Sequence, residues 1–232
     1  MLIIIIVLVV IGQLINLRYD LTKNQRHTLS SPTKMLLKNI DQPLKIDIFL
    51  EGKLPAEFLR LRKEISELIK SFQQNTDQIV YEYIDPFEGA KDTNSLVDEM
   101  KSFGITPEYI VQSQSQAVEQ TVVFPWAMLS GGNRTMLIPL IQKNLGDNKQ
   151  QKINRSIEHL EFQFYNALYK LVQKNKETIA ILTSHGASKN IVVADFMRSL
   201  QPYYQLAAFD LKALKNEPEK TIENLNRFKM LI

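Results

Sequence analysis

The first hydrophobic pattern in the chain is a continuous apolar run that has no polar face. The run is unbroken from Leu2 to Ile11, and Leu14, Ile15 and Leu17 extend it. Such a run needs lipid or a very apolar partner, and as a helix it reaches roughly 25 Å, slightly less than a bilayer core of about 30 Å. We predict a transmembrane anchor over residues 1–17. A buried core helix is one alternative, and a signal peptide is another, although its basic flank and cleavage site are missing.

The charges around this run bear on which side of the membrane the rest of the chain lies, and they argue against the extracytoplasmic side. Arg18, Lys23, Arg26 and Lys34 follow the run, whereas no charged side chain precedes it. Taken literally, the positive-inside rule places the rest of the chain in the cytoplasm. The missing basic flank would also result if Met1 were not the natural start. At the other end, the last five residues have the pattern of a strand that stops without a turn. We therefore expect the sequence to be a piece of a longer protein.

Strand and helix patterns alternate after the apolar run. Residues 18–43 form a polar juxtamembrane segment and a first helix, which we expect Ser31 to cap and Pro32 to open. Period-two and helical patterns then follow in the order βαβαββα, which is that of a thioredoxin-like domain. The predicted strands are 44–50, 80–84, 121–129 and 135–141, the last two joined by a hairpin at 131–133, and the predicted helices begin at Pro55, before Leu96 and at Ile153.

A second α/β unit follows a polar linker at residues 173–178. Residues 178–183 are an apolar run typical of a buried parallel strand. A helix at 191–200 and strands at 205–211 and 228–232 complete the pattern. This is the opening of a doubly wound domain of the flavodoxin or glutamine-amidotransferase kind. The predicted organisation is an anchor (1–17), a juxtamembrane segment with a helix (18–43), a thioredoxin-like α/β domain (44–173) and a partial doubly wound domain (178–232).

Composition narrows the function without assigning it. The 232 residues are 44% hydrophobic and 23% charged, as in ordinary globular proteins. The formal net charge is only +3, and Lys and Arg are scattered among Asp and Glu, so we expect no nucleic-acid partner. The chain has no cysteine. A disulfide framework, a thiolate zinc site, a redox CxxC and a cysteine nucleophile are therefore excluded.

The candidate ligand or partner loop is Ser184-His185-Gly186, directly after the first strand of the second unit. Doubly wound folds bind ligands at the carboxyl ends of their strands. With Asp195 or Asp210, the serine and histidine of this loop would suit a hydrolase. The G-x-S-x-G nucleophile elbow is absent, however, and a polar loop with an incidental histidine is the simpler interpretation. The three histidines show no i, i+4 pairing, so no metal site is expected.

Two other features have simple structural interpretations. Asp85, followed by Pro86, is more typical of the end of a strand than of an acid catalyst. Trp126 and its neighbours Phe124 and Pro125 are expected to pack in the core, with an exposed recognition surface as the alternative. We therefore assign no catalytic, cofactor-binding or metal-binding residue from the sequence.

Several short sequence segments, taken together, resemble those of a known family. They are Arg18-Tyr19-Asp20-Leu21-Thr22, His27-Thr28-Leu29-Ser30 followed by Pro32-Thr33, Leu44-Lys45-Ile46-Asp47-Ile48-Phe49-Leu50, Tyr81-Glu82-Tyr83-Ile84-Asp85-Pro86 and Ile179-Ala180-Ile181-Leu182-Thr183-Ser184-His185-Gly186. In this order and spacing they resemble the gliding-motility-associated ABC-transporter auxiliary proteins (GldG-like), over essentially the whole chain. Within the first segment, Arg18, Asp20 and Thr22 form the juxtamembrane motif.

The resemblance implies an inner-membrane protein with one N-terminal anchor in the lipid bilayer and an α/β region in the periplasm. It also implies partnership with an ABC permease and its ATPase subunit, in homo- or hetero-oligomeric assemblies. Members are normally longer and carry a second hydrophobic segment near the C-terminus. The family has no established catalytic residues, so none is carried over. The expected function is an accessory subunit for gliding motility or secretion. A hydrolase-like enzyme and a cell-envelope scaffold are the alternatives.

Overall fold

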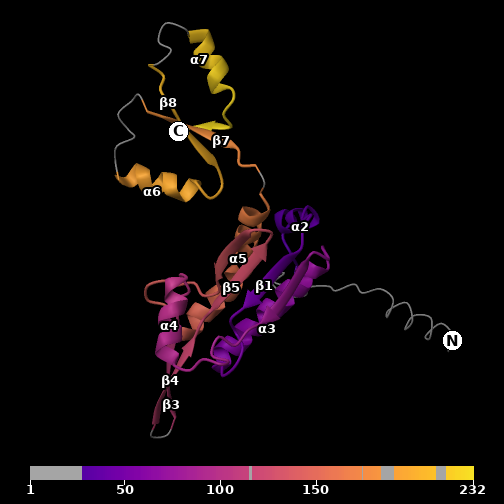
Figure 1. Ribbon diagram of the computed structural model, residues 1–232, viewed down its shortest axis with the longest axis vertical. Coiled ribbons are helices and arrows are strands. Elements are labelled where there is room, and N and C mark those ends of the chain that lie inside the picture. The colour runs from indigo at the N-terminus through magenta and orange to yellow at the C-terminus, as the bar shows by residue number, and fades with distance from the viewer. Residues whose placement is uncertain (1–27, 115–116, 174, 184–190, 213–217) are drawn as a thin grey trace, which may run out of the picture. The chain divides into compact units, whose positions relative to one another are not determined.

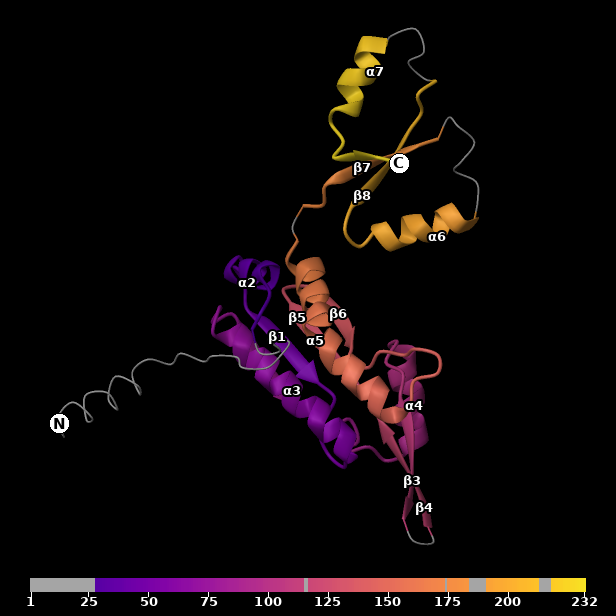
Figure 2. The same ribbon diagram turned by 180° about the vertical axis from the view of Figure 1, so that it is seen from behind.

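The computed structural model describes most of the chain as a mixed α/β protein (Figures 1 and 2). The described residues are 28–114, 117–173, 175–183, 191–212 and 218–232. They divide into two compact units, Met1–Tyr165 and Asn166–Ile232. Among the described helices, none has the length and apolar character needed to span a membrane. The predicted anchor over residues 1–17 and the motif residues Arg18, Asp20 and Thr22 lie outside the described residues.

Helix α2 (Ser31–Lys38) is capped by Ser30 and not, as predicted, by Ser31. Ser30 has an extended backbone, and its Oγ accepts the N–H of Thr33 at 3.4 Å, whereas Ser31 is already helical. The start of the helix is also held by tertiary contacts. Glu161 accepts the Ser30 N–H at 2.9 Å and the Thr33 hydroxyl at 2.6 Å. The cap thus depends on a carboxylate that is remote in sequence.

The main sheet of the first unit has four strands in the order β2-β1-β5-β6. Strand β1 (Leu44–Ile48) is parallel to β2 (Ile79–Tyr83) and antiparallel to β5 (Trp126–Gly131). Strand β5 pairs antiparallel with β6 (Arg134–Pro139) through the predicted glycine hairpin, in which Gly132 has a φ of 56°. This pairing confirms the predicted hairpin. A glycine suits its tight turn because such turns require positive φ.

Two long helices supply much of the core of this unit. Helix α3 (Ala56–Gln73) and helix α5 (Lys149–Val172) meet through Phe72 and Phe164, whose rings lie edge to face with centroids 6.1 Å apart. Both phenylalanines and Ile46 of the central strand β1 have no exposed surface. Burial of such side chains contributes about 1.5–3 kcal/mol each, so this cluster is a main source of stability.

A second, two-stranded sheet follows α4 and precedes β5 along the chain, and the sequence pattern did not predict it. Strands β3 (Glu108–Gln114) and β4 (Ala117–Val123) form an antiparallel hairpin. The single strand predicted over residues 121–129 is wrong, because Phe124 and Pro125 separate β4 from β5. Proline has no N–H and cannot continue a ladder. The missed strand β3 has no period-two apolar pattern beyond residue 111.

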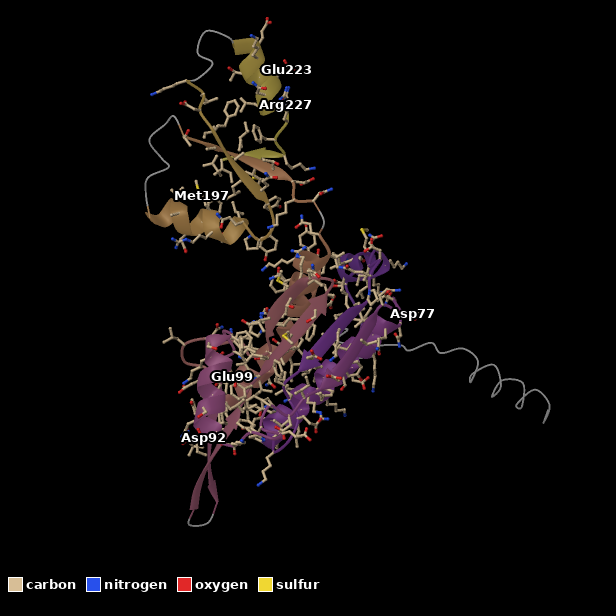
Figure 3. The ribbon with its side chains drawn as sticks, viewed as in Figure 1. Asp77, Asp92, Glu99, Met197, Glu223 and Arg227 are labelled. Atoms are coloured by element: carbon tan, nitrogen blue, oxygen red, sulfur yellow. The ribbon has the colours of Figure 1, made fainter. Side chains whose placement is uncertain are left out.

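Helix α4 (Thr93–Ser102) is capped by Asp92, whose side chain accepts the N–H of Ser95 at 2.7 Å. Figure 3 labels Asp92 at this end of the helix. The helix ends as predicted, just before Gly104, which has a φ of 84°. Its buried side chain is Val97, which packs in a cluster with Phe124 and Ile105. The partly buried Trp126 lies against this cluster and donates its indole N–H to Thr106 O at 2.8 Å. The core interpretation of Phe124 and Trp126 is confirmed.

The second unit contains a parallel sheet in the order β8-β7-β9. Its elements are β7 (Thr178–Leu182), α6 (Ile191–Leu200), β8 (Gln205–Phe209), α7 (Pro218–Leu225) and β9 (Met230–Leu231). Strand and helix alternate here as the sequence predicts, with α7 as an additional helix. The division between the two units falls within the residues of α5, whereas composition placed a linker at 173–178. The domain bounds drawn from composition stay predictions.

Candidate functional site

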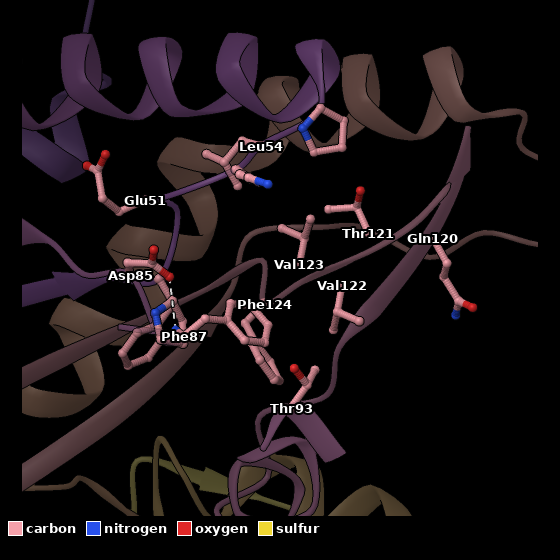
Figure 4. Close-up of a pocket in the computed structure, with 14 residues that line it drawn as sticks. Glu51, Leu54, Asp85, Phe87, Thr93, Gln120, Thr121, Val122, Val123 and Phe124 are labelled. Atoms are coloured by element: carbon pink, nitrogen blue, oxygen red, sulfur yellow. Dashed lines mark hydrogen bonds between the residues drawn. The ribbon is translucent and has the colours of Figure 1, made fainter. Parts of the chain in front are cut away.

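A cleft of about 680 Å³ opens where the parallel strands β1 and β2 end (Figure 4). Open α/β sheets generally bind ligands at the carboxyl ends of such strands. Four segments line the cleft: the loop after β1, the turn after β2, the first residue of α4, and β4 together with Phe124. The lining residues are Phe49, Glu51, Lys53, Leu54, Pro55, Asp85, Pro86, Phe87, Thr93, Gln120, Thr121, Val122, Val123 and Phe124.

The walls of the cleft combine apolar and polar side chains in nearly equal measure. Figure 4 shows Thr121 and Val123 on the side of Leu54, at the start of α3, and Val122 on the opposite side, toward Thr93. This alternation follows from the two-residue period of strand β4. Near the base, the rings of Phe87 and Phe124 lie with centroids 5.6 Å apart. The cleft can therefore take up an apolar group between its two walls.

Asp85 shapes one end of the cleft. Its Oδ1 accepts the N–H of Phe87 at 2.9 Å and closes a turn after β2 (Figure 4). The same carboxylate lies against Gly52, which has a φ of 84°, and a Cβ at this glycine would overlap the carboxylate. The loop after β1 can thus approach the turn after β2 only because residue 52 has no side chain. This contact supports the structural interpretation of Asp85.

The negative charge of Glu51 is neutralised by an arginine that does not line the cleft. Glu51 forms an ion pair with Arg62 of α3, with Nη1 to Oε1 at 2.9 Å. The guanidinium group lies over the ring of Tyr83, 4.3 Å from the centroid. The Tyr83 hydroxyl donates to Arg62 O at 2.9 Å and lies 2.8 Å from Ser66 Oγ. Burial raises the pKa of the Tyr83 phenol, which stays protonated and serves as a donor.

The remaining charge at the cleft is on Lys53, which is exposed and forms no ion pair within the described part of the chain. The described residues also contain no group of three His, Asp or Glu side chains placed to hold a metal ion. The cleft thus has walls of mixed polarity, one aspartate that closes a turn, one glutamate that is paired with Arg62, and one exposed lysine.

A carboxylate with two lysines fixes the base of the β3–β4 hairpin. Glu108, the first residue of β3, lies 2.8 Å from Lys143 Nζ and 2.5 Å from Lys152 Nζ. Burial raises the pKa of the Glu108 carboxyl, but the hydrogen bonds from both lysines outweigh burial and hold that pKa below its ordinary value. Lys149 also donates to the carbonyl of Val111, at 3.1 Å. These bonds position β4 along the cleft through its partner strand.

Glu108→Gln is expected to destabilise the first unit by about 1–2 kcal/mol at neutral pH, because charge-assisted hydrogen bonds to two lysines are lost. A lowered folded-state pKa contributes stability that is present above the unfolded-chain pKa of about 4.3 and is lost as the pH falls through the lower folded pKa. The difference from wild type should therefore shrink below about pH 4. Urea unfolding at a series of pH values measures it. Glu99→Gln, on the exposed side of α4, is the control. A difference that does not depend on pH would contradict the pairing.

Of the candidate residues that the structure describes, neither Asp195 nor Asp210 is among those that line this cleft. Ser184, His185 and Gly186 lie outside the described residues. Of the two aspartates, Asp195 is exposed on α6, and Asp210 accepts the N–H of Lys212 at 2.8 Å in the turn after β8. The rule that pointed to the strand end at residue 184 also applies to β1. Used there, it would have indicated the loop at 49–55.

The comparisons with known proteins give one match. The model of a family described as a domain of unknown function (DUF7088) matches residues 23–130, a segment that contains every residue lining the cleft. No curated protein and no solved structure matches the chain. The chain is thus similar to this family over residues 23–130.

Proposed function

We propose that the protein is a membrane-anchored accessory subunit of a bacterial ABC transporter, for gliding motility or secretion, and that it acts by binding rather than by catalysis. The observation that supports binding over catalysis concerns the partners of the two carboxylates at the cleft. Glu51 is paired with Arg62, and Asp85 holds the turn at Phe87. Acid–base catalysis needs a group within reach of a substrate proton, whereas the Glu51 carboxylate is held by Arg62. Asp85 keeps an acceptor position beside its turn, which suits contact with a cationic group of a partner. An open cleft that can take up a side chain of a partner suits a substrate-engaging or scaffolding role.

The proposed architecture is a thioredoxin-like domain that contains the β3–β4 hairpin as an insertion, followed by the start of a doubly wound domain. The sheet order β2-β1-β5-β6, with β1 parallel only to β2, supports the first part. The parallel order β8-β7-β9 supports the second. Since a fold alone does not define a function, and no cysteine is present, this architecture carries no redox role.

The proposed location is the inner membrane, with residues 1–17 in the bilayer and the α/β units in the periplasm. The apolar run and the resemblance to auxiliary proteins of ABC transporters support it. In such an assembly the ATPase supplies free energy, so the accessory subunit needs only contacts that differ between transporter states. The anchor raises its local concentration near the permease.

Alkaline phosphatase fused after Gln173 should be active, and activity only of a cytoplasmic reporter would contradict this location.

The functional test is co-purification from native membranes after mild cross-linking. We expect an ABC permease and its ATPase in amounts comparable to the bait. A matched control replaces residues 1–17 with an unrelated single-span anchor, which separates contacts of the anchor from those of the folded units. Recovery of no transporter subunit would leave the scaffold alternative. Loss of complementation in Ser184→Ala or His185→Ala at normal abundance would favour the hydrolase.

A further inference from the structure

Strand β4 has one paired edge and one open edge. On the partner strand, the carbonyl of Val111 accepts a hydrogen bond from Lys149, so it points outward from the hairpin. In an antiparallel ladder the two residues of such a pair both direct their backbone groups outward, and Val111 is paired with Gln120. Gln120 and, two residues on, Val122 therefore direct N–H and C=O groups outward from β4. Among the described strands, none other than β3 pairs with β4.

The two edges of the hairpin differ in their neighbours: lysines lie at the β3 edge but not at the β4 edge within the described residues. The β3 edge carries Lys149 on its carbonyl, and Lys143 and Lys152 surround Glu108 at its start. Lysines on an edge are one of the devices that prevent pairing with another chain. The β4 edge has no such cover within the described part of the chain. It runs along the cleft instead, and residues 120–123 line that cleft (Figure 4).

We propose that β4 accepts an extended segment of a partner protein as an added strand, with an apolar side chain of that segment in the cleft and an adjacent basic residue beside Asp85. This inference rests on the proposed binding function and specifies its partner. Backbone groups at Gln120 and Val122 have the two-residue spacing that an added strand pairs with. Leu54 and Phe87 contribute apolar surface for the inserted side chain. The Asp85 carboxylate uses one N–H partner and retains acceptor capacity for a cation.

The first test uses synthetic peptides and the full chain in detergent. The probe is a capped nonapeptide of alternating valine and threonine with a central Leu-Lys pair. Two further versions carry N-methyl groups on one or the other set of alternate residues, which removes donors from one edge of the peptide and leaves every side chain. Only one set faces β4, so we expect one version to bind at least about tenfold more weakly and the other to bind like the parent. Equal binding by all three, or no binding by the parent, would overturn the proposal.

The second test uses a matched pair of protein variants. Gln120→Pro removes an outward N–H from the β4 edge, and Val111→Pro removes the N–H of its cross-strand partner from the β3 edge. Both positions belong to the same ladder pair, so both changes affect the hairpin alike. We expect Gln120→Pro to weaken binding of the parent peptide at least about tenfold and Val111→Pro to leave it unchanged. An equal loss in both variants would show that hairpin integrity, not the β4 edge, decides binding.

Two further experiments test the contact of the peptide lysine with Asp85 and the identity of the chain that pairs with β4. Norleucine in place of the peptide lysine should weaken binding to the wild type but not to Asp85→Asn; equal weakening would remove Asp85 from the contact. Sedimentation measures self-association. Dimers that disappear in Gln120→Pro would assign the β4 edge to a second copy of the chain and overturn the partner proposal. Transporter subunits recovered without peptide binding would refute this inference alone, whereas peptide binding without transporter subunits would refute the proposed function alone.

Discussion

Phe164→Ala is expected to lower the free energy of unfolding of the first unit by about 3–5 kcal/mol. The ring has no exposed surface and packs edge to face on Phe72 of α3, so its removal leaves a cavity between the two helices. Urea unfolding followed by the fluorescence of Trp126, the one tryptophan in the sequence, reports on this unit. A loss of this size is comparable to much of the stability of a small domain, so the unit should be partly unfolded at moderate temperature.

Phe162→Ala on the same helix is the matched control. Its ring is 60% exposed, and the expected change in the free energy of unfolding is within about 0.5 kcal/mol. The two variants remove the same atoms, and only burial distinguishes them. Similar losses in both would mean that α5 does not pack through the face that carries Phe164.

Gly52→Ala is expected to destabilise the first unit by about 2–4 kcal/mol. About 1–2 kcal/mol comes from the left-handed backbone, and the rest from overlap of the new Cβ with the Asp85 carboxylate, which pushes the loop and the turn apart. Thermal unfolding measures the loss. The cleft should open as well, and the parent peptide should bind more weakly.

Gly89→Ala separates the two causes. Gly89 also has a positive φ, 75°, but a Cβ there has no atom within 4 Å, so only the backbone cost of about 1–2 kcal/mol is expected. Combining Gly52→Ala with Asp85→Ala should recover part of the loss, because the overlap disappears. Strictly additive effects in this double variant would contradict the close approach of residues 52 and 85.

Elements with one buried face could be predicted from the sequence. Helix α3, with Phe58, Leu61, Ile65 and Ile69 at helical spacing, is buried along that stripe as expected. Strand β1 was found from its apolar alternation as well, although Asp47, one of the polar positions of that pattern, is itself buried. Both patterns report on burial, and burial of apolar surface is the main driving force of folding.

Elements held by remote polar contacts could not be predicted. The β3–β4 hairpin mixes apolar and polar residues without a sustained period-two pattern. Its base is fixed by Glu108 between Lys143 and Lys152, more than thirty residues away. The cap of α2 was misplaced by one residue for a related reason, since Glu161 on α5 completes it. Such contacts carry no periodic signal in the sequence.

The sequence by itself determined the α/β class, the order of most elements, the absence of thiol chemistry and the glycine hairpin between β5 and β6. Only the tertiary structure decided where the cleft lies and what lines it. Gly52 and Asp85 meet there although they follow different strands, and β4 reaches the same place from beyond α4. The physical reason is that local patterns encode which face of an element is buried, whereas a site depends on which strand ends the sheet order brings together.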